Sequence, residues 1–196
     1  SGAADVNFVL DASGFKYEKY SFLLVEDKVE QEKWILKNID IKSFDLKSFD
    51  VSKDYSGLPK MELKMQLSIN HYASLSGKRM FIPLKIYHPL KNIPSADTNR
   101  VNDIILKNSY VETDSVLFEI PSGYSFEYLP DSTHTETKFG TFEMNVSRNG
   151  NSIVYHRKLQ VNKGRFPASD YPGFLKFYKT IQKVDKQQMV LVKIEN

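Results

Sequence analysis

The sequence MELKMQLSI, residues 61–69, decides the fold class, because every odd-numbered residue in it is apolar and every even-numbered residue is polar. Successive side chains of an extended chain point to opposite faces, so this stretch has one apolar face and one polar face. The period of two predicts a half-buried β-strand. After a turn that contains Ser74, Ser76 and Gly77, we expect residues 80–87 to return as the partner strand, with Pro83 at a sheet edge or a bulge.

Other parts of the chain repeat this alternation on both sides of residues 61–69. Residues 39–51 alternate with phase slips near Ser43 and at Lys47-Ser48, which predicts a bulged strand. Asn149-Gly150 separates two alternating runs and is typical of a two-residue hairpin turn, since both residues tolerate positive φ. Strands are therefore predicted at residues 17–24, 39–51, 61–69, 80–87, 116–120, 124–129, 139–146, 153–161 and 189–194.

Two helices are predicted among these strands. The spacing of Val25, Val29 and Leu36 predicts a short amphipathic helix near residues 25–37. A longer helix near the C-terminus is expected to follow a cap at Ser169-Asp170, with Pro172 in its first turn, where a missing N–H costs nothing. Its apolar face consists of Phe174, Phe177, Tyr178, Ile181 and Val184.

Together these elements predict a mainly β chain with an antiparallel, β-sandwich-like fold, built as one domain or as two β lobes. Residues 91–103 are polar and contain a proline, which favours a linker between two lobes. We expect residues 1–92 to form a β-rich lobe with the short helix. Residues 93–196 are expected to form a β-meander lobe with the C-terminal helix and a final strand. Residues 1–4, Ser-Gly-Ala-Ala, read as the start of a piece cut from a longer protein.

Composition excludes several classes of function. Lys and Arg exceed Asp and Glu by three, and the charges are interleaved along the chain, so we expect no nucleic-acid partner. The absence of cysteine excludes disulfides, thiolate metal sites and a cysteine nucleophile. No run of about 18 apolar residues occurs, so the sequence predicts no membrane-spanning helix.

The sequence shows no pattern that specifies catalysis, a cofactor or a metal. His71, His88, His134 and His156 lack the spaced partners that a catalytic base or a metal site needs, so a hydrolase that uses His and Asp has no visible partnered base. Glu112 and Asp114 share one side of an extended segment, and we interpret them as solvated carboxylates rather than cation ligands. We therefore predict no enzyme active site, no cofactor and no metal ligand in this chain.

A set of tyrosines supports an alternative interpretation, in which the chain has a ligand-binding site. Exposed aromatic rings on a sheet face can stack on sugar rings, whereas buried rings fill a core. The residues proposed for ligand stacking are Tyr72, Tyr87, Tyr110, Tyr124 and Tyr128. On this interpretation the chain is a glycan- or peptide-binding module.

The second half of the chain resembles a known family. Its features run Ile120-Pro121, Gly123-Tyr124, Leu129-Pro130, Phe139-Gly140, Arg157, Leu159, Phe166-Pro167, Tyr171, Phe174, Phe177 and Ile181. This pattern is similar to the uncharacterised C-terminal domain of transglutaminase-like proteins of Bacteroides and related bacteria, and residues 41–84 resemble the strand-rich segment that precedes that domain.

The resemblance carries expectations about function and location. In that family an uncharacterised N-terminal domain and a transglutaminase-like core precede this region, and the catalytic Cys, His and Asp belong to the core. The resemblance therefore implies a non-catalytic accessory module of an exported transglutaminase-like or peptidase-like protein. Its partner would be the upstream transglutaminase-like domain, with a protein or glycan ligand as the alternative. Its location would be periplasmic, in the cell envelope or extracellular.

Overall fold

A computed structural model describes residues 2–95 and 100–194 of the chain. Antiparallel strands dominate, with a long helix near the C-terminus and a shorter one in the first half, so the predicted fold class is confirmed. The chain divides into two compact units, Ser1–Ser74 and Leu75–Asn196. This division differs from the predicted one near residue 92, because β5 (Arg79–Pro83) pairs with β13 (Gln188–Lys193) and so belongs to the second unit.

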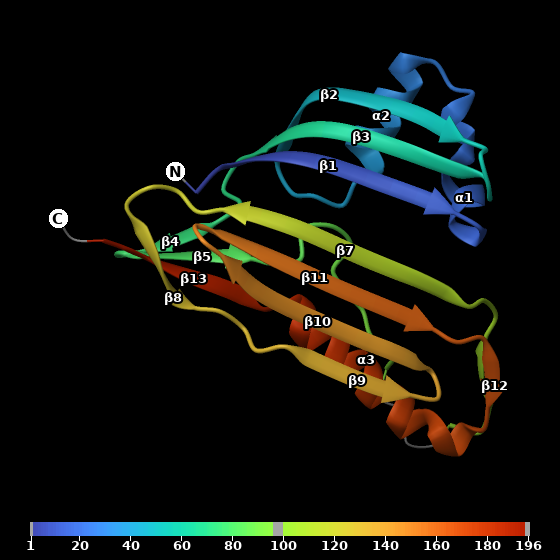
Figure 1. Ribbon diagram of the computed structural model, residues 1–196. Helices are drawn as coiled ribbons and strands as arrows, with labels where there is room; N and C mark the ends of the chain where they lie inside the picture. Colours follow the sequence, from blue (N-terminus) through green and yellow to red (C-terminus); the bar gives the residue numbers. More distant parts are fainter. Residues whose placement is uncertain (1, 96–99, 195–196) are drawn as a thin grey trace. The chain divides into compact units, whose positions relative to one another are not determined.

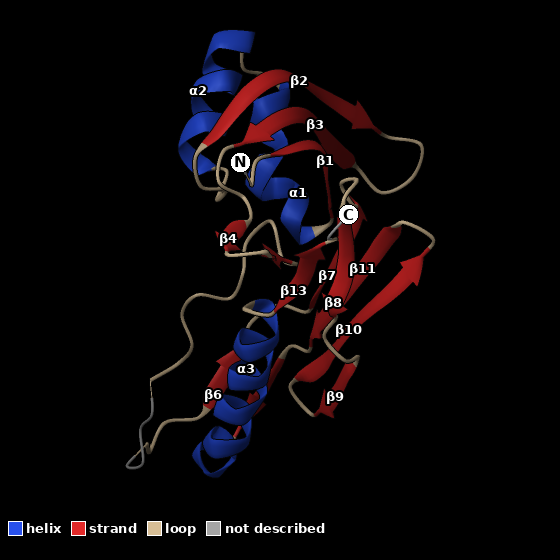
Figure 2. Cartoon of the chain, turned by 90° about the vertical axis from the view of Figure 1, so that its left-hand side faces the viewer, coloured by secondary structure: helices blue, strands red, loops and turns tan. Residues whose placement is uncertain are grey.

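Unit 1 is a three-stranded antiparallel sheet with helices on one face (Figures 1 and 2). The strand order is β1 (Ala4–Ser13), β3 (Lys60–Ile69) and β2 (Phe44–Asp54). The central strand β3 contains residues 61–69, and its five apolar side chains are at most 3% exposed. Figure 2 shows α1 (Phe15–Tyr20) and α2 (Lys28–Asn38) on one face of this sheet, and the 3-10 helix η1 (Ser21–Leu24) connects them. The half-buried strand predicted from the alternation is confirmed.

Two local predictions for unit 1 are wrong, and one strand was missed. The partners of β3 are β1 and β2 rather than residues 80–87, because β2 and β3 form a hairpin across residues 55–59 and β1 pairs with the other edge of β3. Residues 17–24 are helical rather than extended, and they pack Phe22 edge-to-face on Trp34 with ring centroids 5.7 Å apart. Strand β1 was not predicted, and the apolar Val9 between Phe8 and Leu10 interrupts the alternation that would have indicated it. The bulge predicted at Lys47-Ser48 is present as a register shift between Leu46 and Ser48.

The short helix predicted near residues 25–37 is confirmed as α2, but its predicted apolar face is wrong. Asp27 caps the helix by accepting hydrogen bonds from the N–H groups of Val29 and Glu30, both at 2.9 Å. Val25, Val29 and Leu36 are 84%, 60% and 52% exposed. The helix instead buries Gln31 and Ile35, because apolar residues lie on two sides of it.

Unit 2 contains the strands of the predicted meander. Its largest sheet has the order β7 (Tyr110–Glu119), β11 (Ser152–Val161), β10 (Gly140–Asn149) and β9 (Thr133–Thr137). The hairpin at Asn149-Gly150 is confirmed by the register of β10 and β11. Residues 133–137, for which no strand was predicted, form β9 and pair with the second edge of the central strand β10.

Two smaller sheets complete the strand pairing. One has the order β4 (Ser74–Ser76), β5, β13 and β8 (Tyr124–Tyr128), and the other pairs β12 (Gly164–Phe166) with β6 (Ile104–Leu106). The predicted linker contains no helix or strand within residues 91–95 and 100–103, and its residues 96–99 lie outside the described part of the chain.

Helix α3 (Tyr171–Asp185) closes the core of unit 2 and follows the 3-10 helix η2 (Ala168–Asp170). Phe177 and Ile181 are at most 1% exposed, and the Phe174 ring meets the Phe139 ring edge-to-face at 5.2 Å, so the predicted apolar face is confirmed. The predicted side-chain cap is wrong, because Asp170 directs its carboxylate to the Lys138 Nζ at 2.6 Å instead. Among the described residues, no helix combines the length and apolar character needed to cross a bilayer.

Candidate functional site

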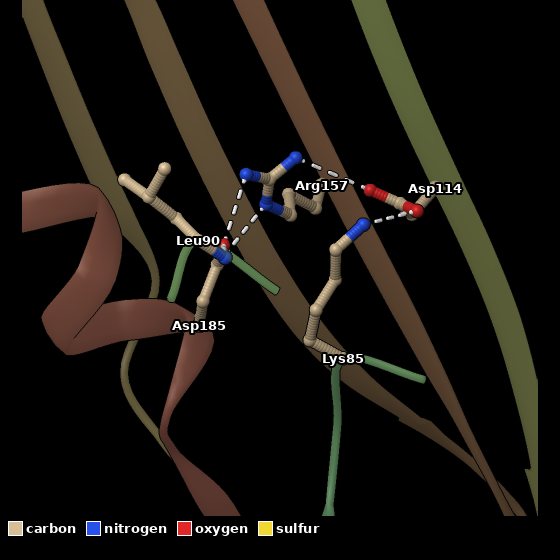
Figure 3. A network of polar contacts seen from close by, with 5 residues as sticks. All are labelled: Lys85, Leu90, Asp114, Arg157 and Asp185. Carbon is tan, nitrogen blue, oxygen red and sulfur yellow. Dashed lines mark hydrogen bonds and ion pairs between the residues drawn. The ribbon is translucent and has the colours of Figure 1, made fainter. Parts of the chain in front are cut away.

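The strongest constellation of charged groups in the chain is a buried network inside unit 2 (Figure 3). Arg157 donates from Nε to Asp185 Oδ1 at 2.7 Å and from Nη2 to Asp185 Oδ2 at 3.2 Å. Its Nη1 reaches Asp114 Oδ2 at 3.3 Å, and Lys85 Nζ donates to Asp114 Oδ1 at 2.5 Å. The backbone N–H of Leu90 donates to Asp185 Oδ2 at 2.9 Å. The four side chains therefore form one continuous chain of ion pairs.

Three elements and the loop after β5 place these side chains. Arg157 lies on β11 in the inward phase, and Asp114 lies directly opposite it on β7. Asp185 is the last residue of α3, and Lys85 follows the end of β5. The other inward residues of β11 are apolar and buried: Ile153, Tyr155, Leu159 and Val161. Arg157 is thus a single charge in an apolar row, which requires a partner charge from a neighbouring element.

The network is buried and electrically neutral. The side chains of Arg157 and Asp185 are 2% and 0% exposed, and those of Lys85 and Asp114 are 5% and 20% exposed. Burial lowers the pKa of Lys85, and the nearby Arg157 acts in the same direction, whereas Asp114 opposes the shift. The guanidinium carbon of Arg157 also lies 5.2 Å from the centre of the Phe142 ring, which suits a planar cation.

The geometry of the network favours a structural role. A catalytic lysine must present a free amine to substrate, whereas the Lys85 ammonium is hydrogen-bonded to a carboxylate within the interior. Each carboxylate is shared between two donors from different elements. The network therefore ties the end of α3 and residues 85–90 to the sheet. The interpretation of Asp114 as a solvated carboxylate is wrong, because it belongs to this network.

A second group of titratable side chains lies near the network on β7 and α3. Tyr110 and Tyr178 share a side-chain hydrogen bond, and burial is the main cause that raises the pKa of each phenol. The negative charge of Glu112 raises both pKa values further. These phenols therefore stay protonated at neutral pH and act as packing groups with a polar end.

The four histidines lie in separate places. His71 and His88 occupy left-handed backbone conformations, with φ of 56° and 48°, outside the strands. His134 and His156 are exposed on β9 and β11, and His134 Nδ1 lies 3.4 Å from Glu143 Oε1. Within the described residues, no group of three or more His, Cys, Asp or Glu side chains could hold a metal ion.

The proposed stacking tyrosines are distributed over several elements. Tyr124 and Tyr128 share strand β8, and Tyr128 is 49% exposed. Tyr110 points inward from β7, and Tyr87 packs on His88 with ring centroids 4.2 Å apart. Tyr72 belongs to unit 1, where burial raises its pKa. Ligand stacking by these residues stays a prediction, with β8 as the one element that carries two of them.

Unit 1 exposes a set of large apolar side chains on its helices and on the turn between η1 and α2, which we name the helix surface. Its members, with their exposed fractions, are Phe15 (55%), Phe22 (38%), Val25 (84%), Val29 (60%) and Leu36 (52%). Val29 and Leu36 lie seven residues apart on α2, which places them on the same side of the helix. The spacing that predicted a buried face therefore describes an exposed one.

Sequence reasoning missed the ion network because its members are far apart in the chain and follow no motif. Asp114 and Arg157 are separated by 43 residues, and Arg157 and Asp185 by 28. One signal was present: a lone arginine in the apolar phase of a predicted strand indicates a buried ion pair. The sequence alone could have flagged Arg157, but its partners depend on strand register and helix docking.

Comparison with known proteins identifies the larger part of the chain. No curated protein and no solved structure matches the chain significantly. Residues 78–191 match the model of a family described as a domain of unknown function with solved-structure structure, DUF3858, and this range lies within unit 2. The match covers more than half of the chain, which therefore belongs to the DUF3858 family.

Proposed function

We propose that the chain is a non-catalytic accessory module of an exported transglutaminase-like or peptidase-like protein, where it acts in domain docking. The observation that carries the proposal is the helix surface of unit 1. Its five large apolar side chains are between 38% and 84% exposed, although the same unit buries the odd-numbered residues of β3 almost completely. Exposed apolar side chains are typical of protein–protein contacts where they lie together, as Val29 and Leu36 do on one side of α2.

The partner in this proposal is a catalytic domain carried upstream on the same polypeptide. This assignment rests on the likeness of the sequence to the C-terminal regions of transglutaminase-like proteins, and it implies a location in the periplasm or cell envelope, or outside the cell. Helix α2 presents Val29 and Leu36 on one side, which suits an apolar groove on the partner. Because Val29 and Leu36 are 60% and 52% exposed, completing their burial in a contact would contribute about 1–2 kcal/mol each, roughly half of the value for a fully exposed side chain.

The ion network supports a scaffold role for unit 2. Its charges pair with one another inside the unit, and they fix α3 and residues 85–90 on the sheet. Such an arrangement makes the unit rigid and leaves no free amine at the network. A rigid module can hold a neighbouring domain in one orientation without contributing a reactive group.

The test compares variants of the full-length gene product that carries this region. Val29→Lys combined with Leu36→Lys places two charges on the helix surface, and Leu117→Lys is the matched control. Leu117 is also 60% exposed, but it lies on the outward face of β7 in unit 2. We expect the double variant to lower the thermal stability and the yield of the catalytic domain, while Leu117→Lys leaves both unchanged.

Deletion of residues 1–196 should reproduce the effect of the double variant on the catalytic domain. The proposal fails if the deleted protein keeps its stability, location and activity. It also fails if Leu117→Lys has the same effect as the double variant, because the loss would then reflect added charge rather than a lost contact.

A further inference from the structure

We propose that one side of helix α3 binds the surface of an anionic lipid bilayer, without crossing it, through a row of lysines. We name this row the lysine stripe, and its members are Lys176, Lys179, Lys183 and Lys186. All of these residues are exposed. The inference concerns unit 2 alone and does not depend on the helix surface of unit 1 or on a catalytic domain.

The spacing of the lysine stripe places its members along one line of the helix. Successive lysines are three, four and three residues apart, close to the length of one helical turn of about 3.6 residues. At about 100° per residue the side chains lie within an arc of about 80°, and they extend over about 15 Å along the helix axis. Lys186 is the C-cap residue of α3 and still has a helical backbone conformation. A flat charged surface can therefore contact the whole stripe at once.

The other sides of α3 are occupied by unit 2 itself, so the lysine stripe is the outward side of the helix. α3 packs on the strands of unit 2 from one side (Figure 2), and its buried residues include Phe177 and Ile181. Residues 90–95 lie along another side. Gln182 Nε2 donates to the Lys91 carbonyl oxygen at 2.7 Å, and the Tyr171 hydroxyl donates to the Ser95 carbonyl oxygen at 2.5 Å.

No acidic residue of α3 neutralises the lysine stripe. The positions three and four residues before and after each lysine hold no Asp or Glu. The carboxylates at the two ends of the helix pair elsewhere, since Asp170 lies 2.6 Å from Lys138 Nζ and Asp185 lies 2.7 Å from Arg157 Nε. Within the described part of the chain, none of the ammonium groups of the stripe takes part in an ion pair or a hydrogen bond.

Helix stability alone does not account for the lysine stripe. The helix macrodipole favours cations in the last turn, which suits Lys183 and Lys186. Lys176 and Lys179 lie in the middle of the helix, where this effect has faded. Lysines three or four residues apart also repel each other, and each neighbouring pair in the stripe has this spacing. Binding to an anionic surface would offset the repulsion.

The chemistry of the lysine stripe favours a bilayer over a protein or a nucleic acid. Fixed carboxylates and base edges are typically bound by the planar fork of arginine, and the stripe contains no arginine. Lysine is a compact point charge on a flexible stem. Lipid headgroups move laterally, so each lysine can attract an anionic headgroup without a matching pattern of charges on the partner. Groups of about four to eight basic residues on an amphipathic helix are typical of anionic lipid binding.

Vesicle co-sedimentation with the whole chain measures this binding. The probe vesicles contain equal parts of phosphatidylcholine and phosphatidylglycerol, and the control vesicles contain phosphatidylcholine alone. Each lysine near an anionic surface raises the affinity about fivefold, so the full stripe raises it at least about 100-fold. We expect binding to the anionic vesicles at low salt, no binding to the neutral vesicles, and release at about 1 M salt, where the screening length is about 3 Å.

A matched pair of fourfold variants tests the position of the binding surface. The stripe variant combines Lys176→Gln, Lys179→Gln, Lys183→Gln and Lys186→Gln. The control variant combines Lys37→Gln, Lys42→Gln, Lys47→Gln and Lys158→Gln, at exposed residues outside α3. Both variants remove the same charge from a chain with a net charge of +3. The affinity for anionic vesicles should fall at least about 100-fold in the stripe variant and less than about fivefold in the control variant.

Two measurements in the absence of lipid complete the test. The stripe variant should melt at or above the temperature of the parent chain, because the repulsion between neighbouring lysines is removed. Acetylation by a lysine-specific reagent, followed by mass spectrometry, should modify the whole stripe in the free chain. Anionic vesicles should then reduce acetylation of the stripe more than that of Lys158.

Several outcomes would overturn the inference. One is the absence of binding to the anionic vesicles, or an equal loss of binding in the two fourfold variants. Another is slow acetylation of the stripe in the free chain, because another part of the chain or a second copy would then cover it. A third is binding to a short DNA duplex or to polyglutamate but not to the vesicles at the same salt, which would assign the stripe to a nucleic acid or an acidic protein.

Discussion

Removal of the Asp185 carboxylate should destabilise unit 2 strongly. Asp185→Ala deletes two hydrogen bonds from Arg157 and one from the Leu90 N–H. It also leaves a guanidinium that is 2% exposed with Asp114, at 3.3 Å, as its one remaining ion-pair partner among the described residues. Breaking a buried ion pair from one side costs about 3–5 kcal/mol, because the remaining charge stays desolvated. For a domain whose total stability is about 5–15 kcal/mol, this loss is large.

Urea unfolding monitored by circular dichroism measures the effect. With a slope of about 2 kcal/mol per molar urea, a loss of about 3–5 kcal/mol lowers the midpoint by about 1.5–2.5 M. Trp34 is the single tryptophan and lies on α2, so its fluorescence reports the unfolding of unit 1 separately. We expect Asp185→Ala to lower the urea midpoint of the circular dichroism transition of unit 2 more than the midpoint of the Trp34 fluorescence transition, which reports unit 1.

Asp103→Ala is the matched control. Asp103 accepts a hydrogen bond from Arg165 Nε at 2.6 Å, but the Arg165 side chain is 75% exposed and that of Asp103 is 33% exposed. Exposed ion pairs of this kind contribute about 0–1 kcal/mol. Equal midpoints for the two variants would refute the reasoning, because the network would then contribute no more than a surface pair.

Two further predictions concern close packing and pH. Gly140→Ala should lower the free energy of unfolding by about 3 kcal/mol in chemical denaturation, because an added Cβ would lie 2.0 Å from the Gln160 carbonyl oxygen. Gly150→Ala meets no atom within 4 Å and should lower it by about 1 kcal/mol, because the residue has a φ of +59°. Equal losses for the two variants would contradict this prediction. Because burial raises the pKa of Tyr110 and Tyr178 above the unfolded value of 10.0, these phenols ionise more readily in the unfolded chain, and stability should fall as pH rises above about 10. Tyr110→Phe should reduce this slope in thermal melts between about pH 9 and 11, and an unchanged slope would count against the assigned cause.

Alternation and turn residues predicted the strands whose neighbours lie close in sequence. The hairpin at Asn149-Gly150 was predictable because a two-residue turn fixes both partners and their register. The central position of residues 61–69 was not predicted, because one of their partners, β1, lies about 50 residues or more away in the sequence. The other partner, β2, is joined to β3 by residues 55–59 only, so this hairpin was within reach of sequence reasoning, which chose residues 80–87 instead.

Helical periodicity predicted the existence of α2 but not the side that it buries. Val25, Val29 and Leu36 form a regular apolar stripe, yet the core takes Ile35 and the amide of Gln31. Gln31 is buried because its Nε2 donates to the carbonyl oxygens of Leu23 and Glu26 at 2.7 and 3.0 Å. A polar residue that satisfies backbone carbonyls can replace an apolar one at the core, and no hydrophobic scale signals this substitution.

The two units differ in how they treat their charged and apolar side chains, and this difference bears on where a partner binds. Unit 2 pairs its buried charges internally, and its long edge strand β7 turns acidic side chains inward. Unit 1 leaves large apolar side chains exposed, among them Val29 and Leu36 on α2. The match to the DUF3858 family is confined to residues 78–191, so the helix surface of unit 1 lies outside that match. If unit 2 is the common scaffold, then unit 1 is the part in which specificity for a partner can vary, and substitutions at Val29 and Leu36 should change binding without unfolding unit 2.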